Sequence, residues 1–247
     1  MTNKQKILIT GGAGYVGAVL VPTLLDEGYE VTVIDLMIYG EDILEEHPKL
    51  KKISGDIRDF DLLNQVITSE KPDFVFHLAA QAIVSTSYSE PMETISSNVM
   101  GTTKVLETLR VSNHECTAII ITSDKAYDNV EQVWGYKEND PMGGKDIYSG
   151  SKGAAELIFK SYFHSFFKSD ESNVRVAVAR AGNVIGGGDW AKDRIIVDCV
   201  TSWSEGNSVN IRSPGATRPW QHVLEPLSGY LSLGQSLVFQ PKLHGNA

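Results

Sequence analysis

The chain has 247 residues, of which 42% are hydrophobic, and this is enough for one α/β domain with a sizeable buried core. Its formal net charge of -9 argues against a nucleic acid or an anionic membrane as the partner, although a local basic pocket for phosphates is compatible with it. No apolar run reaches the roughly 18 residues of a membrane span, and an early first strand leaves no room for a signal peptide, so a cytoplasmic location is the default expectation.

The first predicted strand, residues 6–10, is a short apolar run that stops at glycines, as a buried parallel strand does. Gly11, Gly14 and Gly17 follow at intervals of three. Glycines in this position allow a tight strand-to-helix turn and bring backbone N–H groups close to a pyrophosphate. We therefore predict that this turn, together with Tyr15 and Val16, binds a dinucleotide; the alternative is a plain turn.

Two acidic residues follow the next two predicted strands. Asp35 ends a strand over residues 30–34, where a carboxylate accepts hydrogen bonds from the adenosine ribose, repels a 2′-phosphate and so selects NAD over NADP. A turn residue is the alternative for Asp35. Asp56 and Ile57 follow a third short strand, and Asp56 is expected to reach the adenine, to cap the next helix, or to do both.

The fourth predicted strand, residues 73–78, ends in small residues that let the chain pass close to a flat cofactor. Leu78, Ala79 and Ala80 are therefore candidate cofactor contacts. His77 lies inside the strand, where a core histidine with satisfied hydrogen bonds is the favoured interpretation. Asn98 lies in a helical run over residues 92–109; such a residue usually bonds the backbone, but it is also counted as a candidate cofactor contact.

The fifth predicted strand, residues 117–122, places Ser123, Asp124 and Lys125 at its carboxyl end, the edge at which open parallel sheets bind ligands. Tyr148 and Lys152 begin a helix over residues 148–168 and lie one turn apart on the same face. An ammonium group near a phenol lowers the pKa of the phenol, which makes Tyr148 a candidate general base for a hydroxyl group. The alternative is a surface Tyr–Lys pair with no catalytic role.

Strands alternate with helices up to a sixth strand at residues 174–179, which predicts a doubly wound parallel sheet of the Rossmann type. We assign residues 1–182 to an NAD-binding domain and residues 183–247 to a small substrate-binding part interleaved with it. Arg194, Arg212 and Arg218 are candidates to hold a diphosphate. Cys116 and Cys199 are too few and too distant for a zinc site or a disulfide framework, so we expect no metal.

The glycine triplet, the serine after a middle strand and the Tyr-x-x-x-Lys pattern resemble the extended short-chain dehydrogenase/reductase superfamily. From residue 74 onward the sequence is similar to CDP-glucose 4,6-dehydratases, most specifically in Gly-Gly-Gly-Asp-Trp at residues 186–190 and Ala-Thr-Arg-Pro-Trp-Gln-His-Val at residues 216–223. The resemblance implies an NAD-dependent lyase that oxidises C4 of a nucleotide-activated glucose, eliminates water across C5 and C6 and returns hydride to C6. The nucleotide, whether CDP, dTDP, GDP or UDP, stays open.

The resemblance also implies individual roles. Tyr148 and Lys152 handle the proton of the 4-hydroxyl and are also expected to contact the cofactor. Ser123 holds the 4-oxygen, and Asp124 donates a proton to the departing 6-hydroxyl. Lys125 takes part in the elimination in a role left open. The residues implied for substrate binding are Gln81, Asn183, Arg194 and Arg218.

Three further expectations come from the superfamily. A homodimer is expected through two long helices, near residues 92–113 and 148–168. The substrate-binding part is expected to be truncated, because the family usually continues for roughly a hundred residues more. The alternatives to a dehydratase are a nucleotide-sugar 4-epimerase and a non-catalytic NAD-binding module.

Overall fold

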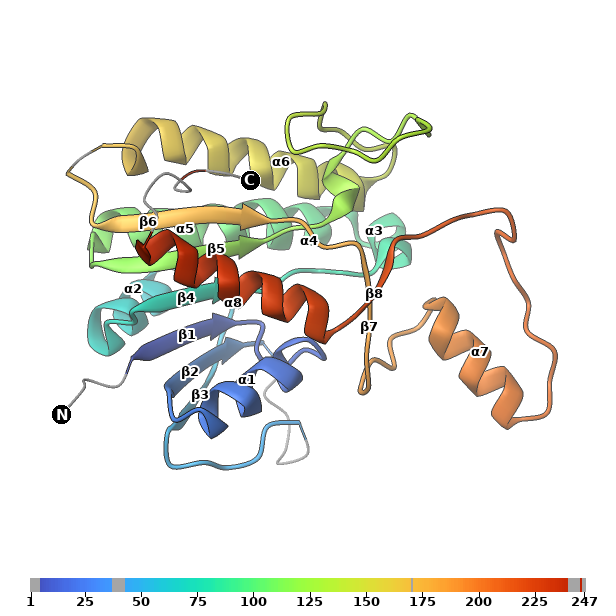
Figure 1. Cartoon of the computed structure of the whole chain (residues 1–247), viewed down its shortest axis with the longest axis horizontal. Helices are drawn as coiled ribbons and strands as arrows, with labels where there is room; N and C mark the ends of the chain where they lie inside the picture. Colours follow the sequence, from blue (N-terminus) through green and yellow to red (C-terminus); the bar gives the residue numbers. More distant parts are fainter. Residues whose placement is uncertain (1–4, 37–42, 170, 240–244, 246–247) are drawn as a thin grey trace.

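A six-stranded parallel sheet, in the order β3-β2-β1-β4-β5-β6, forms the centre of the molecule (Figure 1). The computed structural model describes residues 5–36, 43–169, 171–239 and 245. The strands are β1 (Lys6–Thr10), β2 (Glu30–Asp35), β3 (Leu50–Ser54), β4 (Phe74–His77), β5 (Cys116–Ile121) and β6 (Val174–Ala179). The chain starts at β1, runs outward to β3 and then crosses to β4, so the strand order reverses between β1 and β4. This confirms the doubly wound sheet predicted from the sequence.

Helices cover both faces of the sheet. Helices α1 (Gly17–Asp26) and α8 (Leu224–Phe239) lie on one face, and α2 (Phe60–Glu70), α5 (Thr102–Ser112) and α6 (Ile147–Tyr162) lie on the other (Figure 1). Neighbouring strand residues point to opposite faces, so Ile9 is buried with α1 and α8 whereas Leu8 is buried with α2, α5 and α6. A sheet buried on both faces explains why its strands read as nearly unbroken apolar runs.

The helix expected over residues 92–109 is built from three pieces, α4 (Pro91–Ile95), the π-helical η1 (Ser96–Gly101) and α5. The helix expected over residues 148–168 corresponds to α6 followed by the π-helical η3 (Phe163–Phe167). Asp146 caps α6, because its carboxylate accepts a hydrogen bond from the Ser149 backbone N–H at 2.9 Å. The cap of α2 is Asp59 and not Asp56, so the capping role considered for Asp56 is wrong.

The chain after residue 182 does not pack as a unit of its own. A two-stranded parallel sheet pairs β7 (Asn183–Ile185) with β8 (Trp220–His222), and between them α7 (Ile195–Ser204) stands away from the main sheet with no buried residue (Figure 1). Helix α8 then returns to the main sheet, where Leu227, Tyr230 and Leu237 join the same core as β1. Residues 224–239 therefore help to cover the sheet, and the assignment of residues 183–247 to an interleaved substrate-binding part stays a prediction.

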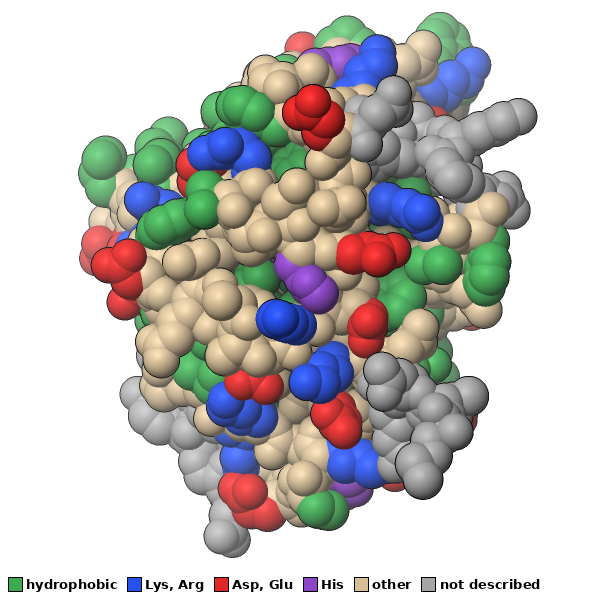
Figure 2. Space-filling view, turned by 90° about the vertical axis from the view of Figure 1, so that its left-hand side faces the viewer, with side chains coloured by type: hydrophobic (Ala, Val, Ile, Leu, Met, Phe, Trp, Pro, Cys, Tyr) green, Lys and Arg blue, Asp and Glu red, His purple; other side chains and the backbone are tan. Residues whose placement is uncertain are grey.

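The ends of the sheet differ in character. Figure 2 shows the face at the amino ends of the strands, where basic and acidic side chains are interspersed. The carboxyl ends carry α3 (Val84–Ser89), the short 3-10 turn η2 (Asp124–Ala126), the start of α6 and the β7–β8 pair. None of the helices in the described ranges has the length and apolar character needed to cross a membrane.

Candidate active site

The loops at the carboxyl ends of the strands enclose a cavity of ≈ 1340 Å³. It lies at the point where the strand order reverses, which is where open α/β sheets bind their ligands. Most of the predicted site residues line it. They are Gly11, Gly14, Tyr15, Val16, Asp35, Asp56, Ile57, Leu78, Ala79, Ala80, Gln81, Ser123, Asp124, Lys125, Tyr148, Lys152, Asn183, Arg194, Arg212 and Arg218.

The glycine turn after β1 packs directly against the loop after β4. Gly11 has a φ of +75°, and a Cβ added to it would lie 2.5 Å from the backbone nitrogen of Ala79. A side chain is therefore excluded both by conformation and by space. Gly17 does not line the cavity; a Cβ on it would lie 2.4 Å from the carbonyl oxygen of Gly12, so it lets α1 close on the turn, and its contact with the cofactor stays a prediction.

Two carboxylates stand on the side of the cavity nearest β2 and β3. Asp35 accepts a hydrogen bond from the backbone N–H of Ala13 at 3.0 Å, which ties the end of β2 to the glycine turn. Arg58 donates from Nε to both carboxylate oxygens of Asp56, at 3.0 and 2.9 Å, and this lowers the pKa of Asp56. The bare glycine backbone and the acidic end of β2 fit a dinucleotide with an unmodified adenosine ribose.

Arg58 also belongs to the cavity wall's support, although no sequence motif singles it out. It binds Asp56 and also Glu93 on α4, with Nη1 2.7 Å from a carboxylate oxygen, so it fastens the predicted adenine side of the cavity to the helix layer. Its position two residues after Asp56 could have predicted the ion pair, because a basic side chain at that spacing can reach the carboxylate.

Asn98 does not reach the cavity. Its side chain is buried, with the amide oxygen accepting the Gln81 N–H at 2.9 Å and the amide nitrogen donating to the Gln81 carbonyl at 3.0 Å and to Ser151 Oγ at 2.9 Å. These bonds fix the backbone of Gln81, which does line the cavity, and a direct contact between Asn98 and the cofactor stays a prediction.

Tyr148 and Lys152 are both buried on α6, with Lys152 Nζ 6.0 Å from the centre of the Tyr148 ring. Burial lowers the pKa of Lys152 to about 8, and the negative charge of Glu156 opposes that shift. Burial also raises the pKa of Tyr148, against a hydrogen bond with Ser123 that favours the phenolate. The expected lowering of the Tyr148 pKa is thus wrong for the protein alone, because loss of solvation outweighs its favourable contacts.

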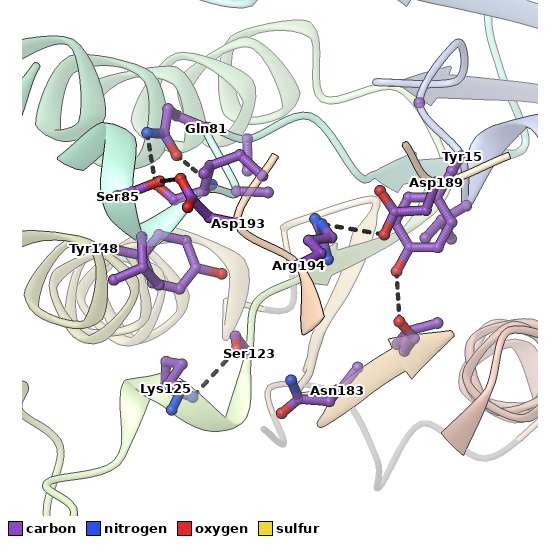
Figure 3. Close-up of a pocket in the computed structure, with 18 of the residues that line it drawn as sticks. Tyr15, Gln81, Ser85, Ser123, Lys125, Tyr148, Asn183, Asp189, Asp193 and Arg194 are labelled. Atoms are coloured by element: carbon purple, nitrogen blue, oxygen red, sulfur yellow. Dashed lines mark hydrogen bonds and ion pairs between the residues drawn. The ribbon is translucent and has the colours of Figure 1, made fainter. Parts of the chain in front are cut away.

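The turn after β5 brings a serine, a carboxylate and a lysine to the cavity next to Tyr148 (Figure 3). Ser123 Oγ donates to Asp124 Oδ1 at 3.0 Å and accepts from the backbone N–H of Lys125 at 3.2 Å. Groups able to accept and to donate protons therefore meet beside the tyrosine, and they come from two different elements of the fold.

The predicted diphosphate-binding arginines occupy different settings. The guanidinium of Arg194 lies 5.5 Å from the centre of the Tyr15 ring, and its Nε is 3.1 Å from Asp189 Oδ2 (Figure 3). Arg212 is held by Asp193 and Asp198 near α7. Arg218 bonds the carbonyl of its neighbour Thr217 at 2.7 Å. Arg194 is therefore the arginine that the structure places against the glycine turn.

His77 is a core residue, as predicted. Its ring nitrogens form hydrogen bonds with the hydroxyls of Thr10 at 2.7 Å and Thr102 at 3.1 Å, and burial lowers its pKa to about 3. No group of three or more His, Cys, Asp or Glu side chains suited to a metal ion occurs among the residues that the structure describes.

Comparison with known proteins places this geometry in a family. Residues 8–233 match the sequence family described as GDP-mannose 4,6 dehydratase. A CDP-glucose 4,6-dehydratase of Salmonella typhimurium is 47% identical over 246 residues, which cover 94% of this chain and 67% of the relative. A UDP-glucuronic acid decarboxylase 1 of Danio rerio is 27% identical over 99% of this chain and 57% of its own length. The chain thus spans between about half and two thirds of these relatives.

Solved structures share the fold. A dTDP-glucose 4,6-dehydratase of Streptomyces venezuelae, solved with NAD bound, superposes with a TM-score of 0.81 and 25% identity over 93% of this chain and 71% of its own. A UDP-glucose 4-epimerase of Thermotoga maritima has a TM-score of 0.80 and 24% identity over 92% of this chain and 72% of its own, which shows the fold alone.

Proposed function

The chain belongs to the GDP-mannose 4,6 dehydratase family, which matches residues 8–233, and we propose that it converts a nucleotide-activated glucose into the 4-keto-6-deoxy sugar. The observation that carries this proposal is the meeting of Tyr148 with Ser123, Asp124 and Lys125 in the cavity that also holds the glycine turn. CDP-glucose is the proposed substrate, because the 47% identical relative is a CDP-glucose 4,6-dehydratase.

Dehydratases of this family use NAD, as structures of relatives with bound NAD illustrate. When bound, NAD supplies the acceptor for hydride from C4 and the donor of hydride to C6. On the protein side, the turn with Gly11, Gly14, Tyr15 and Val16 holds the pyrophosphate, and Asp35 receives the adenosine ribose.

The residues of this chain handle the protons. Tyr148, once it is present as the phenolate, accepts the proton of the 4-hydroxyl with the help of the Lys152 ammonium, and Ser123, which contacts Tyr148, orients the 4-oxygen. A ketone at C4 acidifies the hydrogen at C5, whose proton passes to a base of the Ser123–Lys125 turn while the 6-hydroxyl leaves as water. As hydride reaches C6, that proton returns to C5. Asp124, in its protonated form, donates to the departing hydroxyl, and Lys125 assists the elimination from the same turn.

The rest of the cavity wall is proposed to bind the nucleotide sugar. Gln81 has its backbone fixed by Asn98, Asn183 begins β7, and both line the cavity with Arg194 and Arg218. The arginines supply cationic donors of the kind that diphosphates require.

We also propose that the protein forms a homodimer through α4, α5, α6 and the π-helical segments η1 and η3. These elements contact one another and expose large apolar side chains. The exposed residues are Met92, Ile95, Met100, Val111, Leu157 and Phe166.

The proposed function is tested by incubating the chain and NAD with CDP-glucose, dTDP-glucose, UDP-glucose and GDP-mannose, followed by mass spectrometry. Loss of one water from CDP-glucose is the expected result. Formation of an isomer of unchanged mass would instead indicate a 4-epimerase, and an unchanged substrate with NAD retained would indicate a non-catalytic NAD-binding module.

A further inference from the structure

Glu156 is a carboxylate buried without any exposed surface, on α6 one turn after Lys152. Removing a charged carboxylate from water costs several kcal/mol unless paired groups compensate it. Neither the fold nor the proton transfers described above require a charge at this position. The partners that hold Glu156 therefore indicate what it does.

Arg180 and Thr122 supply that compensation. Arg180 Nε lies 2.8 and 2.9 Å from the two oxygens of Glu156, and its Nη2 also binds the carboxylate. Thr122 Oγ1 donates to Glu156 Oε1 at 2.6 Å. Three segments therefore meet at one carboxylate: helix α6, the end of β5 and the end of β6.

Each of these segments leads directly into the candidate site. Thr122 immediately precedes Ser123, and its backbone N–H bonds the carbonyl of Ala179 at 2.9 Å. The N–H of Asp124 bonds the carbonyl of Ala181, also at 2.9 Å. These bonds set the turn after β5 beside β6, and the Glu156 carboxylate attaches both to α6.

Arg180 also reaches the segment between η2 and α6. Its guanidinium lies 4.5 Å from the centre of the Tyr127 ring, and its Nη1 donates to the carbonyl of Glu138 at 3.2 Å. The planar fork of an arginine fixes orientation as well as distance. One side chain thus holds the start of the segment between η2 and α6, at Tyr127, and a point in its interior, at Glu138.

We propose that Glu156 and Arg180 are positioning residues, whose buried ion pair fixes the Ser123–Lys125 turn against the face of α6 that carries Tyr148 and Lys152. The inference rests on the proposed function for its kinetic consequence. A buried ion pair adds little stability compared with well-packed apolar residues. We therefore assign this pair the role of holding the turn and the helix in a fixed relative position.

The pair also acts on charge. Lys152 is faced by Tyr148 and Glu156 on its own helix and by His77 on β4. Tyr148 is faced in turn by Asp124, Arg194 and Asp146. Glu156 holds up the pKa of Lys152, which burial has lowered to about 8. Neutralising Glu156 therefore makes Lys152 lose its proton at lower pH.

The first test is Glu156→Gln, which keeps the shape of the side chain and removes its charge. We expect kcat to fall about 10–100-fold, as for misplaced catalytic groups, with KM for CDP-glucose within about twofold and the alkaline limb of the kcat profile at lower pH. The matched control is Glu70→Gln, which breaks the ion pair with Lys51 between α2 and β3 and should leave these values unchanged. A folded Glu156→Gln protein with wild-type kcat and an unchanged alkaline limb would overturn the proposal.

A second pair of variants covers the case in which Glu156→Gln does not fold. Thr122→Val removes one hydrogen bond to the carboxylate, and Thr122→Ser restores it. We expect Thr122→Val to lower kcat at least fivefold and Thr122→Ser to stay within about twofold of the wild type. Equal kcat values for the two variants would overturn the proposal.

A third measurement separates this inference from the proposed function. The ionisation of Lys152 is followed in the protein without substrate by NMR of ¹³C-labelled lysine, with the signal assigned from Lys152→Met. Its titration should move to lower pH in Glu156→Gln and stay in place in Glu70→Gln. If the wild type does not dehydrate nucleotide sugars but this shift occurs, the proposed function fails and the Glu156–Lys152 coupling stands; an unshifted titration overturns the coupling.

Discussion

The hydroxyl of Tyr148 is the atom on which the proposed oxidation depends. Tyr148→Phe removes it and keeps the buried ring, so the fold should be retained. General acid–base groups typically contribute 10²–10⁴-fold, and kcat with CDP-glucose should fall by about that factor. Steady-state kinetics measure the loss, and NAD binding by calorimetry serves as the control for folding. A variant with more than a tenth of wild-type kcat would show that another group takes the proton.

His77 should make the protein less stable in acid. Its pKa in the folded protein is about 3 against an ordinary value of 6.5, so between these values the unfolded chain binds a proton that the folded protein does not. The contribution of the neutral His77 side chain to the free energy of unfolding is complete above pH 6.5. It is lost as the pH falls towards 3, by about 1.4 kcal/mol per pH unit at most. Unfolding by urea at pH 6, 5 and 4 measures this slope, and His77→Gln should reduce it. An identical slope in the variant would contradict the assignment.

Single residues were predicted unevenly from the sequence. His77 and the cavity positions of Ser123 and Tyr148 follow from strand ends and helical spacing, which are local patterns. Asn98 lies in the π-helical η1, whose residue spacing differs from that of an α-helix, and the partner of Glu156 is Arg180, 24 residues away. The raised pKa of Tyr148 could not be predicted, because burial is set by the packed molecule and not by the lysine four residues later.

At the scale of elements, the glycine turn is the most constrained joint of the fold. Gly11→Ala would place a methyl group 2.5 Å from the backbone of Ala79 in a left-handed conformation. We expect a loss of about 1–3 kcal/mol in the free energy of unfolding and weaker NAD binding. Gly135→Ala is the matched control, because a Cβ there meets no atom within 4 Å. Urea unfolding and NAD calorimetry check both variants, and equal stability would contradict the close approach.

The main strands were predicted to within about one residue, because a strand buried on both faces must be an apolar run with defined ends. The strands and helices after residue 182 were not predicted with defined bounds. Strands β7 and β8 each have three residues and pair across more than thirty positions, so no local pattern marks them. Helix α8 belongs to the main core because the sheet face beside α1 needs a second cover, which becomes visible in the assembled fold.

For the whole molecule, the proposed homodimer predicts that one charged side chain placed in the interface dissociates the dimer. Leu157 is 55% exposed on α6 among the apolar residues of the proposed interface, so Leu157→Asp should convert a dimer to a monomer. Val133→Asp, at a position 98% exposed between η2 and α6, is the control and should leave the mass unchanged. Light scattering after size-exclusion chromatography measures both. A wild-type monomer at micromolar concentration would contradict the dimer.

In the proposed reaction, the hydrogen that leaves C4 returns to C6 of the same sugar, and water is lost between the two transfers. The direct measurement is the reaction of the chain and NAD with CDP-glucose that carries deuterium at C4, followed by NMR and mass spectrometry of the product. We expect a dehydrated product with deuterium at C6. Deuterium at C4 of an isomer that has kept its water would contradict it.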